Sequence, residues 1–182
     1  GYFLIFYPGS FSPDSIEQYG QAIGYWPYND WHPVLHTLFA FALPLKLTGG
    51  WIGSIVLFQI LCFSLTLAYA AYTIVQYGYR KYAYLVFAYI LITPATGNIA
   101  MYPWKDVSFA IAVLLLMAFA LRIYFTDGDW LDSYVHTILF VVVLTVATIF
   151  RHNAVLFTLP FLLAALFYAK RLQRILLVLG VC

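Results

Sequence analysis

Several charged and imidazole side chains stand at the borders of apolar segments, and they are of the types that transfer protons and bind anions. Asp14 follows Ser12-Pro13. Ser is a favoured N-cap and Pro a favoured first helical residue, so Asp14 is predicted to lie in the first turn of a helix. The partial positive charge of a helix N-terminus favours an ionised carboxylate there. Such a carboxylate caps the helix, or it accepts a proton or binds a hydroxyl or a metal ion.

A pair of histidines follows at the start of another predicted helix. His32 and His36 would share a helix face at the spacing of paired metal ligands, but no Glu lies between them and no third ligand is placed. We therefore predict no cofactor; a divalent metal ion is compatible with these residues but has no support in their spacing. His32, close to Asp30, is expected to bind a phosphate oxygen or to form a local hydrogen bond.

Two further charged groups border apolar segments, and each includes a cation. They are Lys105 with Asp106 and Arg151 with His152. Such charges commonly extend toward water as anchors at the membrane surface. Alternatively they converge with Asp14, and the two cations would then match the charge of a phosphate or pyrophosphate where water is scarce.

The chain that carries these residues is very apolar. It is 64% hydrophobic and 9% charged over 182 residues, with a mean hydropathy of +0.89. Globular domains have about 25% charged residues, so this composition predicts an integral membrane protein. The fold class predicted is all-α, a polytopic bundle of transmembrane helices with membrane lipids around it. The net charge of +2 is scattered along the sequence, which excludes a nucleic-acid-binding surface.

Apolar runs bounded by charged or turn residues lie at 33–48, 51–77, 82–94, 107–125, 134–150 and 154–169. As a helix, 51–77 would reach roughly 40 Å and cross a hydrocarbon core of about 30 Å, whereas 33–48 would reach only about 24 Å. We therefore expect 33–48 to lie along the membrane surface rather than to cross as a short or tilted span. Residues 1–182 then form a single transmembrane domain, a fragment of a longer chain, with an external loop and juxtamembrane helices at 8–50 and spans at 51–182.

Basic residues set the orientation of the spans, because loops rich in Lys and Arg stay in the cytoplasm. Alternation places most basic residues on one side, at Arg80, Lys81, Arg122, Lys170, Arg171 and Arg174. The segment 8–32 has no Lys or Arg and falls on the opposite side. We therefore predict a multi-pass protein of the cell membrane with an extracytoplasmic site. The aspartates of the cytoplasmic side predict an ordinary solvated turn, at Asp127, Asp129 and Asp132.

Three local sequence patterns occur in the segments predicted to lie on the extracytoplasmic side. A helix from Pro13 to about Ile23 carries an apolar stripe that predicts contact with the membrane surface, at Ile16, Tyr19, Ala22 and Ile23. Aromatic residues at Tyr25, Trp26, Tyr28 and Trp31 form either an interfacial belt or a surface on which a sugar ring stacks. The segment 94–98, which begins with Pro94, predicts a break in the helix, and irregular backbone at that depth predicts a wet cavity near 94–104.

These motifs occur in an order found in one group of membrane enzymes. Ser12-Pro13-Asp14-Ser15 resembles the Ser-Pro-Asp-Glu of bacterial aminoarabinose transferases, and the segment 30–35 resembles the Asp-x-His-Pro-Pro-Leu of protein O-mannosyltransferases. Lys105 and Asp106 stand where that group has an acidic motif, and the segment 151–153 is similar to its Lys-Gly-Pro segment. The chain thus resembles the membrane glycosyltransferases of the GT-C fold, which use polyprenyl-phosphate sugars, as an uncharacterised bacterial branch.

The resemblance implies an inverting sugar transfer in the cell envelope, from a polyprenyl-phosphate-linked donor to an acceptor on a glycan, a lipid or a protein. Asp14 would be the general base and Asp106 would orient the acceptor or the base, while the leaving phosphate would be held by His32, Arg151 and Lys105. Asp30 and His152 would also bind substrate. Two departures leave the subfamily open: Ser15 replaces a second acid, and Val34 replaces a second proline.

Two other functions are compatible with the sequence. A transporter or flippase for a lipid-linked or anionic solute would use the same cations but needs no base. Transporters usually place charged residues near the middle of the membrane, whereas here nearly all of them lie at span ends. A membrane-anchored assembly subunit is the third alternative.

The predicted orientation has a direct test at Ser10. We expect Ser10→Cys, in a chain whose Cys62 and Cys182 are serines, to react with a membrane-impermeant maleimide on intact cells, because segment 8–32 is predicted to be external. The matched control Asp127→Cys should react only after permeabilisation. Labelling of the two positions in the reverse order would contradict the orientation.

Overall fold

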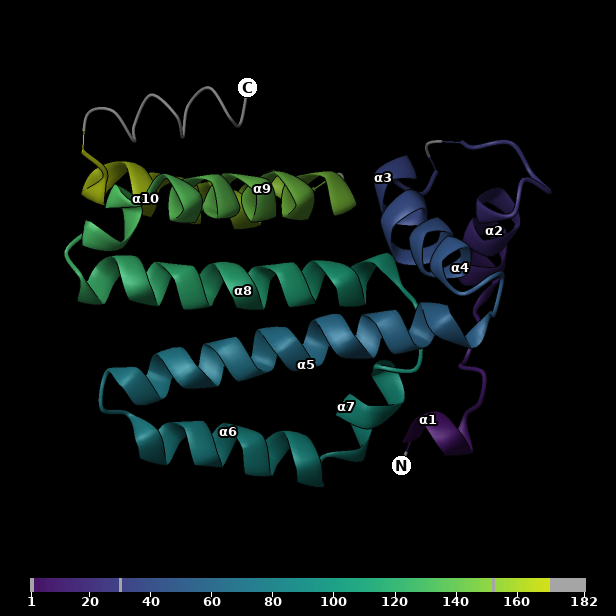
Figure 1. Ribbon diagram of the computed structural model, residues 1–182, viewed down its shortest axis with the longest axis horizontal. Helices are drawn as coiled ribbons and strands as arrows, with labels where there is room; N and C mark the ends of the chain where they lie inside the picture. Colours follow the sequence, from purple (N-terminus) through teal and green to yellow (C-terminus); the bar gives the residue numbers. More distant parts are fainter. Residues whose placement is uncertain (1, 30, 152, 171–182) are drawn as a thin grey trace. The chain divides into compact units, whose positions relative to one another are not determined.

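The computed structural model describes residues 2–29, 31–151 and 153–170, and within these residues every regular element is a helix. Figure 1 shows their order along the chain by colour. The elements are α1 (Tyr2–Ile5), α2 (Pro13–Ala22), α3 (Val34–His36), the π-helical η1 (Thr37–Ala42), α4 (Leu43–Leu47), α5 (Gly53–Gln76), α6 (Arg80–Ile92), α7 (Pro94–Ile99), α8 (Lys105–Phe125), the 3₁₀ turn η2 (Asp129–Asp132), α9 (Tyr134–Phe150) and α10 (Val155–Tyr168). The prediction of an all-α fold is confirmed.

Two of these helices are long and apolar enough to cross a membrane. They are α5, with 24 residues, and α8, with 21 residues. At 1.5 Å per residue they reach about 36 Å and about 32 Å, which exceeds a hydrocarbon core of about 30 Å. The stretch 34–47, α9 and α10 are shorter apolar helices. The structure is therefore compatible with a membrane location through α5 and α8.

The backbone around Pro94 differs from the sequence prediction. Helix α6 ends at Ile92, as a proline two residues later requires, but 94–98 are not irregular. Pro94 is the first residue of the short helix α7, since a proline at that position loses no hydrogen bond that a helix needs. The non-helical backbone follows instead at 101–104.

The residues divide into two compact units, each of which has its own packing. The first comprises Gly1–Leu65 and Tyr84–Phe109, and the second comprises Thr66–Ala83 and Ala110–Cys182. In the first unit, α2 packs on η1, and the core is formed by Ala40, Phe41, Leu45 and Ile55. Tyr19 and Ala22 of α2 pack against this core.

The face that α2 buries is largely polar, and the residues of the predicted apolar stripe lie partly at the surface and partly against the core. Ile16 and Ile23 are 49% and 53% exposed, whereas the fully buried side chains of the helix are those of Ser15, Gln18 and Gln21. The spacing of three residues places these polar groups on one side of the helix. Ser15 and Gln18 form hydrogen bonds with Pro103 and His36, which compensate for the burial of their polar groups.

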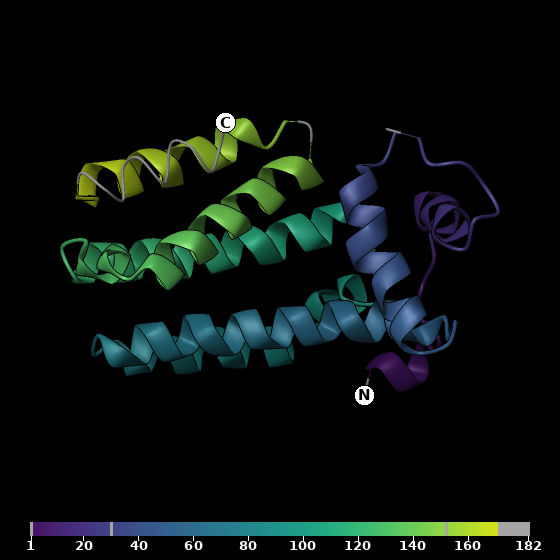
Figure 2. The same ribbon diagram turned by 45° about the horizontal axis from the view of Figure 1, so that its top comes forward.

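Aromatic packing and the hydrogen bonds of Arg122 join helices within the second unit. Phe119 of α8 contacts Tyr69, Trp130 and Phe140. Arg122 donates to Thr73 at 3.1 Å and to Gln76 at 3.0 Å. Figure 2 shows α10, in yellow, running alongside α9, with which it makes contacts.

The turn between α8 and α9 contains the three aspartates that the sequence predicts to be solvated. All are exposed: Asp127, Asp129 and Asp132. Lys170, after α10, forms ion pairs with Asp132 and, at 3.6 Å, with Asp129. The hydrogen bond to Asp132 raises the pKa of Lys170. Asp129 and Asp132 therefore form ion pairs with the residue that follows α10, a role that the sequence pattern did not indicate.

Candidate functional site

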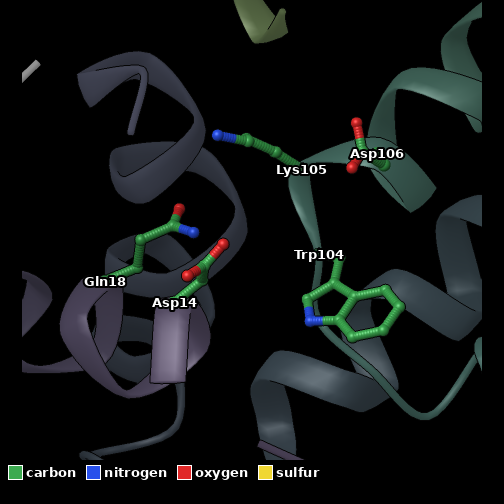
Figure 3. A pocket seen from close by; sticks show the side chains of 5 residues that line it. All are labelled: Asp14, Gln18, Trp104, Lys105 and Asp106. Atoms are coloured by element: carbon green, nitrogen blue, oxygen red, sulfur yellow. The ribbon is translucent and has the colours of Figure 1, made fainter. Parts of the chain in front are cut away.

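A cavity of about 230 Å³ in the first unit brings together side chains from the two ends of that unit's sequence. Its walls are Asp14 and Gln18 of α2, together with Trp104, Lys105 and Asp106 at the start of α8. Figure 3 shows these five side chains around the cavity. Three of the residues that the sequence singled out, Asp14, Lys105 and Asp106, therefore face one space.

Both carboxylates of the cavity stand in the first turn of a helix. Ser12 is the N-cap of α2, with extended backbone angles, and its Oγ accepts from the amide of Ser15 at 3.3 Å. Pro13 is the first helical residue, as the sequence predicts. Asp14 and Asp106 are exposed and occupy the first turns of α2 and α8. Carboxylates are common in this position, because the unpaired amides of a helix N-terminus attract negative charge.

Hydrogen bonds from two serines connect the two walls of the cavity. The indole Nε1 of Trp104 donates to Ser12 Oγ at 2.7 Å, across 92 residues of sequence. The hydroxyl of Ser15 donates to the carbonyl of Pro103 at 3.4 Å, and the two serine oxygens are 3.0 Å apart. Because Ser15 gives its proton to Pro103, Ser12 must donate to Ser15. The start of α2 and the approach to α8 are thus joined by a continuous chain of hydrogen bonds.

The non-helical segment before α8 is held from its other side as well. Gln59 of α5 donates from Nε2 to the carbonyls of Ala100 and Tyr102, at 3.0 and 2.8 Å. The amide of Ser10 donates to the carbonyl of Met101 at 3.0 Å. These bonds satisfy carbonyls that no helix uses. They fix the segment that places Trp104 and the residues after it.

His36 connects α3 to both walls of the cavity. It lies 2.6 Å, through Nδ1, from Gln18 Oε1 and 3.0 Å, through Nε2, from Ser108 Oγ. Thr37 Oγ1 also donates to Gln18 Oε1, at 3.2 Å. Burial, followed by the charges of His32 and Lys105, lowers the pKa of His36 to about 3. The neutral ring therefore donates from Nδ1 to Gln18 and accepts from Ser108. The sequence indicated only a weak metal-ligand pairing for this residue.

His32 does not line the cavity that Asp14 faces. Its side chain is fully buried, and its Nε2 lies 3.6 Å from Glu17 Oε2. Neither ring nitrogen has a hydrogen-bond partner among the described residues. The phosphate contact and the local hydrogen bond expected for His32 therefore both stay predictions, and of the residues that the structure describes, Glu17 has the charged side chain nearest to the ring.

The remaining predicted site residues are placed elsewhere or are not described. Arg151 is exposed at the C-cap of α9, in the second unit. Asp30 and His152 lie outside the described residues. Gln18 and Trp104 were not assigned to the site from the sequence. The signal for Gln18 was its position one helical turn after Asp14, since residues four apart share a face.

The chemistry of the cavity combines an anion-binding group with proton acceptors. Lys105 supplies a positive charge, the two carboxylates accept hydrogen bonds or protons from hydroxyls, and Gln18 presents an amide. Trp104 adds an aromatic wall. In the described part of the chain, no group of three or more His, Cys, Asp or Glu side chains is placed to hold a metal ion. Comparison with protein-family models, with curated proteins and with solved structures gives no match.

The serine connection predicts a measurable loss of stability. Ser12→Ala removes the acceptor of both the Ser15 amide and the Trp104 indole, so we expect the free energy of unfolding to fall by about 1–2 kcal/mol. Denaturant unfolding in detergent micelles measures this change. The matched control is Ser133→Ala, because Ser133 caps α9 without a side-chain hydrogen bond, and it should change stability by less than about 0.5 kcal/mol. Equal effects of the two substitutions would contradict the role of Ser12.

The buried imidazole predicts a pH dependence of stability. Between its ordinary pKa of 6.5 and the folded pKa of about 3, His36 binds a proton only in the unfolded chain. The free energy of unfolding should therefore be undiminished by this group above pH 6.5 and fall below it, by up to about 1.4 kcal/mol per pH unit. Thermal unfolding from pH 7 to pH 5 measures the slope. His36→Gln should flatten it and the control His136→Gln should keep it; an unchanged slope in His36→Gln would refute this origin.

Proposed function

We propose that this chain is part of an inverting membrane glycosyltransferase of the GT-C type. It would move a sugar from a polyprenyl-phosphate donor to an acceptor hydroxyl on the extracytoplasmic face. The observation that carries the proposal is the cavity shared by Asp14, Asp106 and Lys105, whose residues are far apart in the sequence. The order of the sequence motifs supports the same function by resemblance.

Each charged group of the cavity has one role in the proposed reaction. Asp14 takes the proton of the acceptor hydroxyl as its oxygen bonds to the anomeric carbon of the donor, and the bond from that carbon to the phosphate oxygen breaks. The polyprenyl phosphate leaves with the electron pair, and Lys105 offsets its growing negative charge. Asp106 accepts a hydrogen bond that orients the acceptor. A single displacement of this kind inverts the anomeric carbon.

The volume of the cavity limits what it holds. At about 230 Å³ it is smaller than the roughly 300–1,000 Å³ of most ligand pockets. We therefore place only the reacting ends of donor and acceptor in it. The polyprenyl tail would lie outside, against apolar helix surfaces and membrane lipids.

The position of Lys105 and Asp106 on α8 supports a reaction at the membrane surface. They are the first two residues of a helix that is long and apolar enough to span. If α8 crosses the bilayer, its first turn and the cavity lie at a membrane boundary, and the distribution of basic residues assigns that boundary to the extracytoplasmic side. The multi-pass bundle and this orientation are parts of the proposal.

The cations expected at the leaving phosphate have different support. Lys105 lines the cavity, so the proposal assigns the phosphate to it first. Arg151 belongs to the second unit and keeps its role as an expectation. His32 is buried beside Glu17, so it is not used in the proposed reaction.

The general-base role predicts a large loss of activity in Asp14→Asn. Removing a general base costs typically 100- to 10,000-fold in rate, and this variant retains the size of the side chain. The assay uses the full-length protein and measures both sugar transfer and release of free polyprenyl phosphate. The matched control is Asp127→Asn, an exposed aspartate of the α8–α9 turn, which should keep full turnover. Undiminished turnover of a folded Asp14→Asn protein would remove Asp14 from its role.

The same preparation in liposomes separates transfer from transport. Release of polyprenyl phosphate that depends on the acceptor supports the transferase. Appearance of chemically unchanged lipid-linked sugar on the other side of the bilayer, without this release, would favour the transporter or flippase instead.

A further inference from the structure

A second cavity, of about 470 Å³, lies on another face of α2 within the first unit. Its walls are Pro13 and Glu17 of the helix together with Trp26, Pro27 and Asn29 of the segment that follows. None of these residues takes part in the proposed reaction. The cavity combines one large aromatic wall with a carboxylate and an amide.

The position of Trp26 is fixed by the way α2 ends. Gly24 adopts a positive φ of 77°, the amide of Tyr25 donates to Gly20 at 2.8 Å, and that of Gly24 donates to Gln21 at 3.1 Å. This is a Schellman motif, which reverses the chain at the helix C-terminus. The reversal lays the indole of Trp26 on Gly20, where a Cβ would be only 2.2–2.9 Å from three ring atoms. Because Gly20 has no side chain, the indole of Trp26 packs directly on the helix at this residue. The Trp26 side chain remains 40% exposed.

The polar groups of the cavity are also held in place. Glu17 Oε1 accepts from Asn29 Nδ2 at 2.9 Å and from Gln21 Nε2 at 3.4 Å. Its other oxygen lies 3.6 Å from Nε2 of His32, which is fully buried and has no hydrogen-bond partner among the described residues. Asn29 Oδ1 accepts from the amide of Trp31 at 3.1 Å. Carboxylate and amide are therefore oriented before any ligand binds, which reduces the entropy cost of binding.

This combination matches the two surfaces of a sugar ring. A pyranose presents C–H groups on its faces and hydroxyls at its edge, so it packs a face on an indole and donates hydrogen bonds to a carboxylate or an amide oxygen. A lipid chain in the same place would exclude water from the carboxyl group of Glu17 and would offer it no further hydrogen bond, which is unfavourable. The polar wall thus favours a saccharide over a lipid tail as the occupant.

We infer that this cavity is a binding subsite for a pyranose unit of the acceptor, which makes the acceptor a saccharide rather than a lipid or protein hydroxyl. The assignment to the acceptor rests on the proposed function, whereas saccharide binding itself does not. Pro13 and Glu17 line this cavity and Asp14 and Gln18 line the first. Consecutive helix positions differ by about 100° of rotation, so one helix presents the bound saccharide and the general base on adjacent faces.

The test measures saccharide binding directly. Full-length protein in nanodiscs is titrated with methyl glycosides of glucose, mannose, galactose and N-acetylglucosamine, and binding is followed by saturation-transfer NMR. We expect at least one glycoside to bind, and Trp26→Leu and Glu17→Gln each to weaken that binding by about tenfold or more. Glu17→Gln keeps the size of the side chain, so it tests the subsite even if Trp26→Leu disturbs the fold.

The matched control is Trp31→Leu, which changes an indole that is 75% exposed and does not line the cavity, and keeps the backbone amide that binds Asn29. It should bind the glycoside as the unaltered protein does. Equal weakening by Trp31→Leu, or no Trp26-dependent binding of any glycoside, would overturn the subsite. Quenching of Trp26 fluorescence by brominated lipids that saccharide does not relieve would also overturn it, in favour of a membrane-surface role.

The outcome is separable from that of the proposed function. Asp14→Asn should lose sugar transfer and keep glycoside binding, because Asp14 lines the first cavity and not the second. Trp26-dependent binding by a protein that transfers no sugar would support the subsite and reject the transferase. Sugar transfer that is the same in the unaltered and Glu17→Gln proteins at low acceptor concentration would reject the acceptor assignment.

Discussion

The site depends on the hydrogen bond from Trp104 to Ser12. Apolar packing is not directional, and it would allow the start of α2 to shift against the segment before α8. The indole, the two serine hydroxyls and the carbonyl of Pro103 instead form a chain of donors and acceptors with one consistent order. Each neutral bond contributes only about 1 kcal/mol, but a buried group left without its partner costs about 1–3 kcal/mol. This difference holds Asp14 opposite Lys105.

The same chain of bonds explains a departure from the motif that the sequence resembles. Where the aminoarabinose transferases have a second acid after Asp14, this chain has Ser15, whose side chain is fully buried and donates to the carbonyl of Pro103. A glutamate there would bring a carboxylate, which only accepts hydrogen bonds, against a carbonyl that also accepts. The single acid on α2 and the serine connection are therefore linked. In the proposed site, the second carboxylate of the cavity is Asp106, from α8.

Local signals in the sequence gave the helices but not the contacts between them. The run 51–77 became α5 at Gly53–Gln76, and Ser12-Pro13 began α2 as expected, because caps and apolar length act within one segment. The polar face that α2 buries was not predicted, for a non-local reason. Gln18 would be solvated on an isolated helix, and its burial depends on His36, which is 18 residues later. No pattern within α2 contains that information.

His32 shows the same limit at a site residue. Its position beside Asp30 and Pro33 suggested a phosphate ligand or a local hydrogen bond. The ring is buried 3.6 Å from Glu17, a residue 15 positions earlier that the sequence pattern left unassigned. The buried polar side chains of α2 likewise fix the rotation of that helix, and with it the position of Glu17.

That rotation decides which chemistry α2 presents. The helix has only 10 residues, and a turn by one position, about 100°, would move Pro13 and Glu17 toward the cavity of Lys105. An apolar stripe is broad enough to tolerate part of such a turn. Gln18 and Ser15 do not tolerate such a turn, because His36 and Pro103 bind their polar atoms at set distances. The buried polar face therefore allows one short helix to keep Asp14 in the first cavity and Glu17 in the second, on separate and fixed sides.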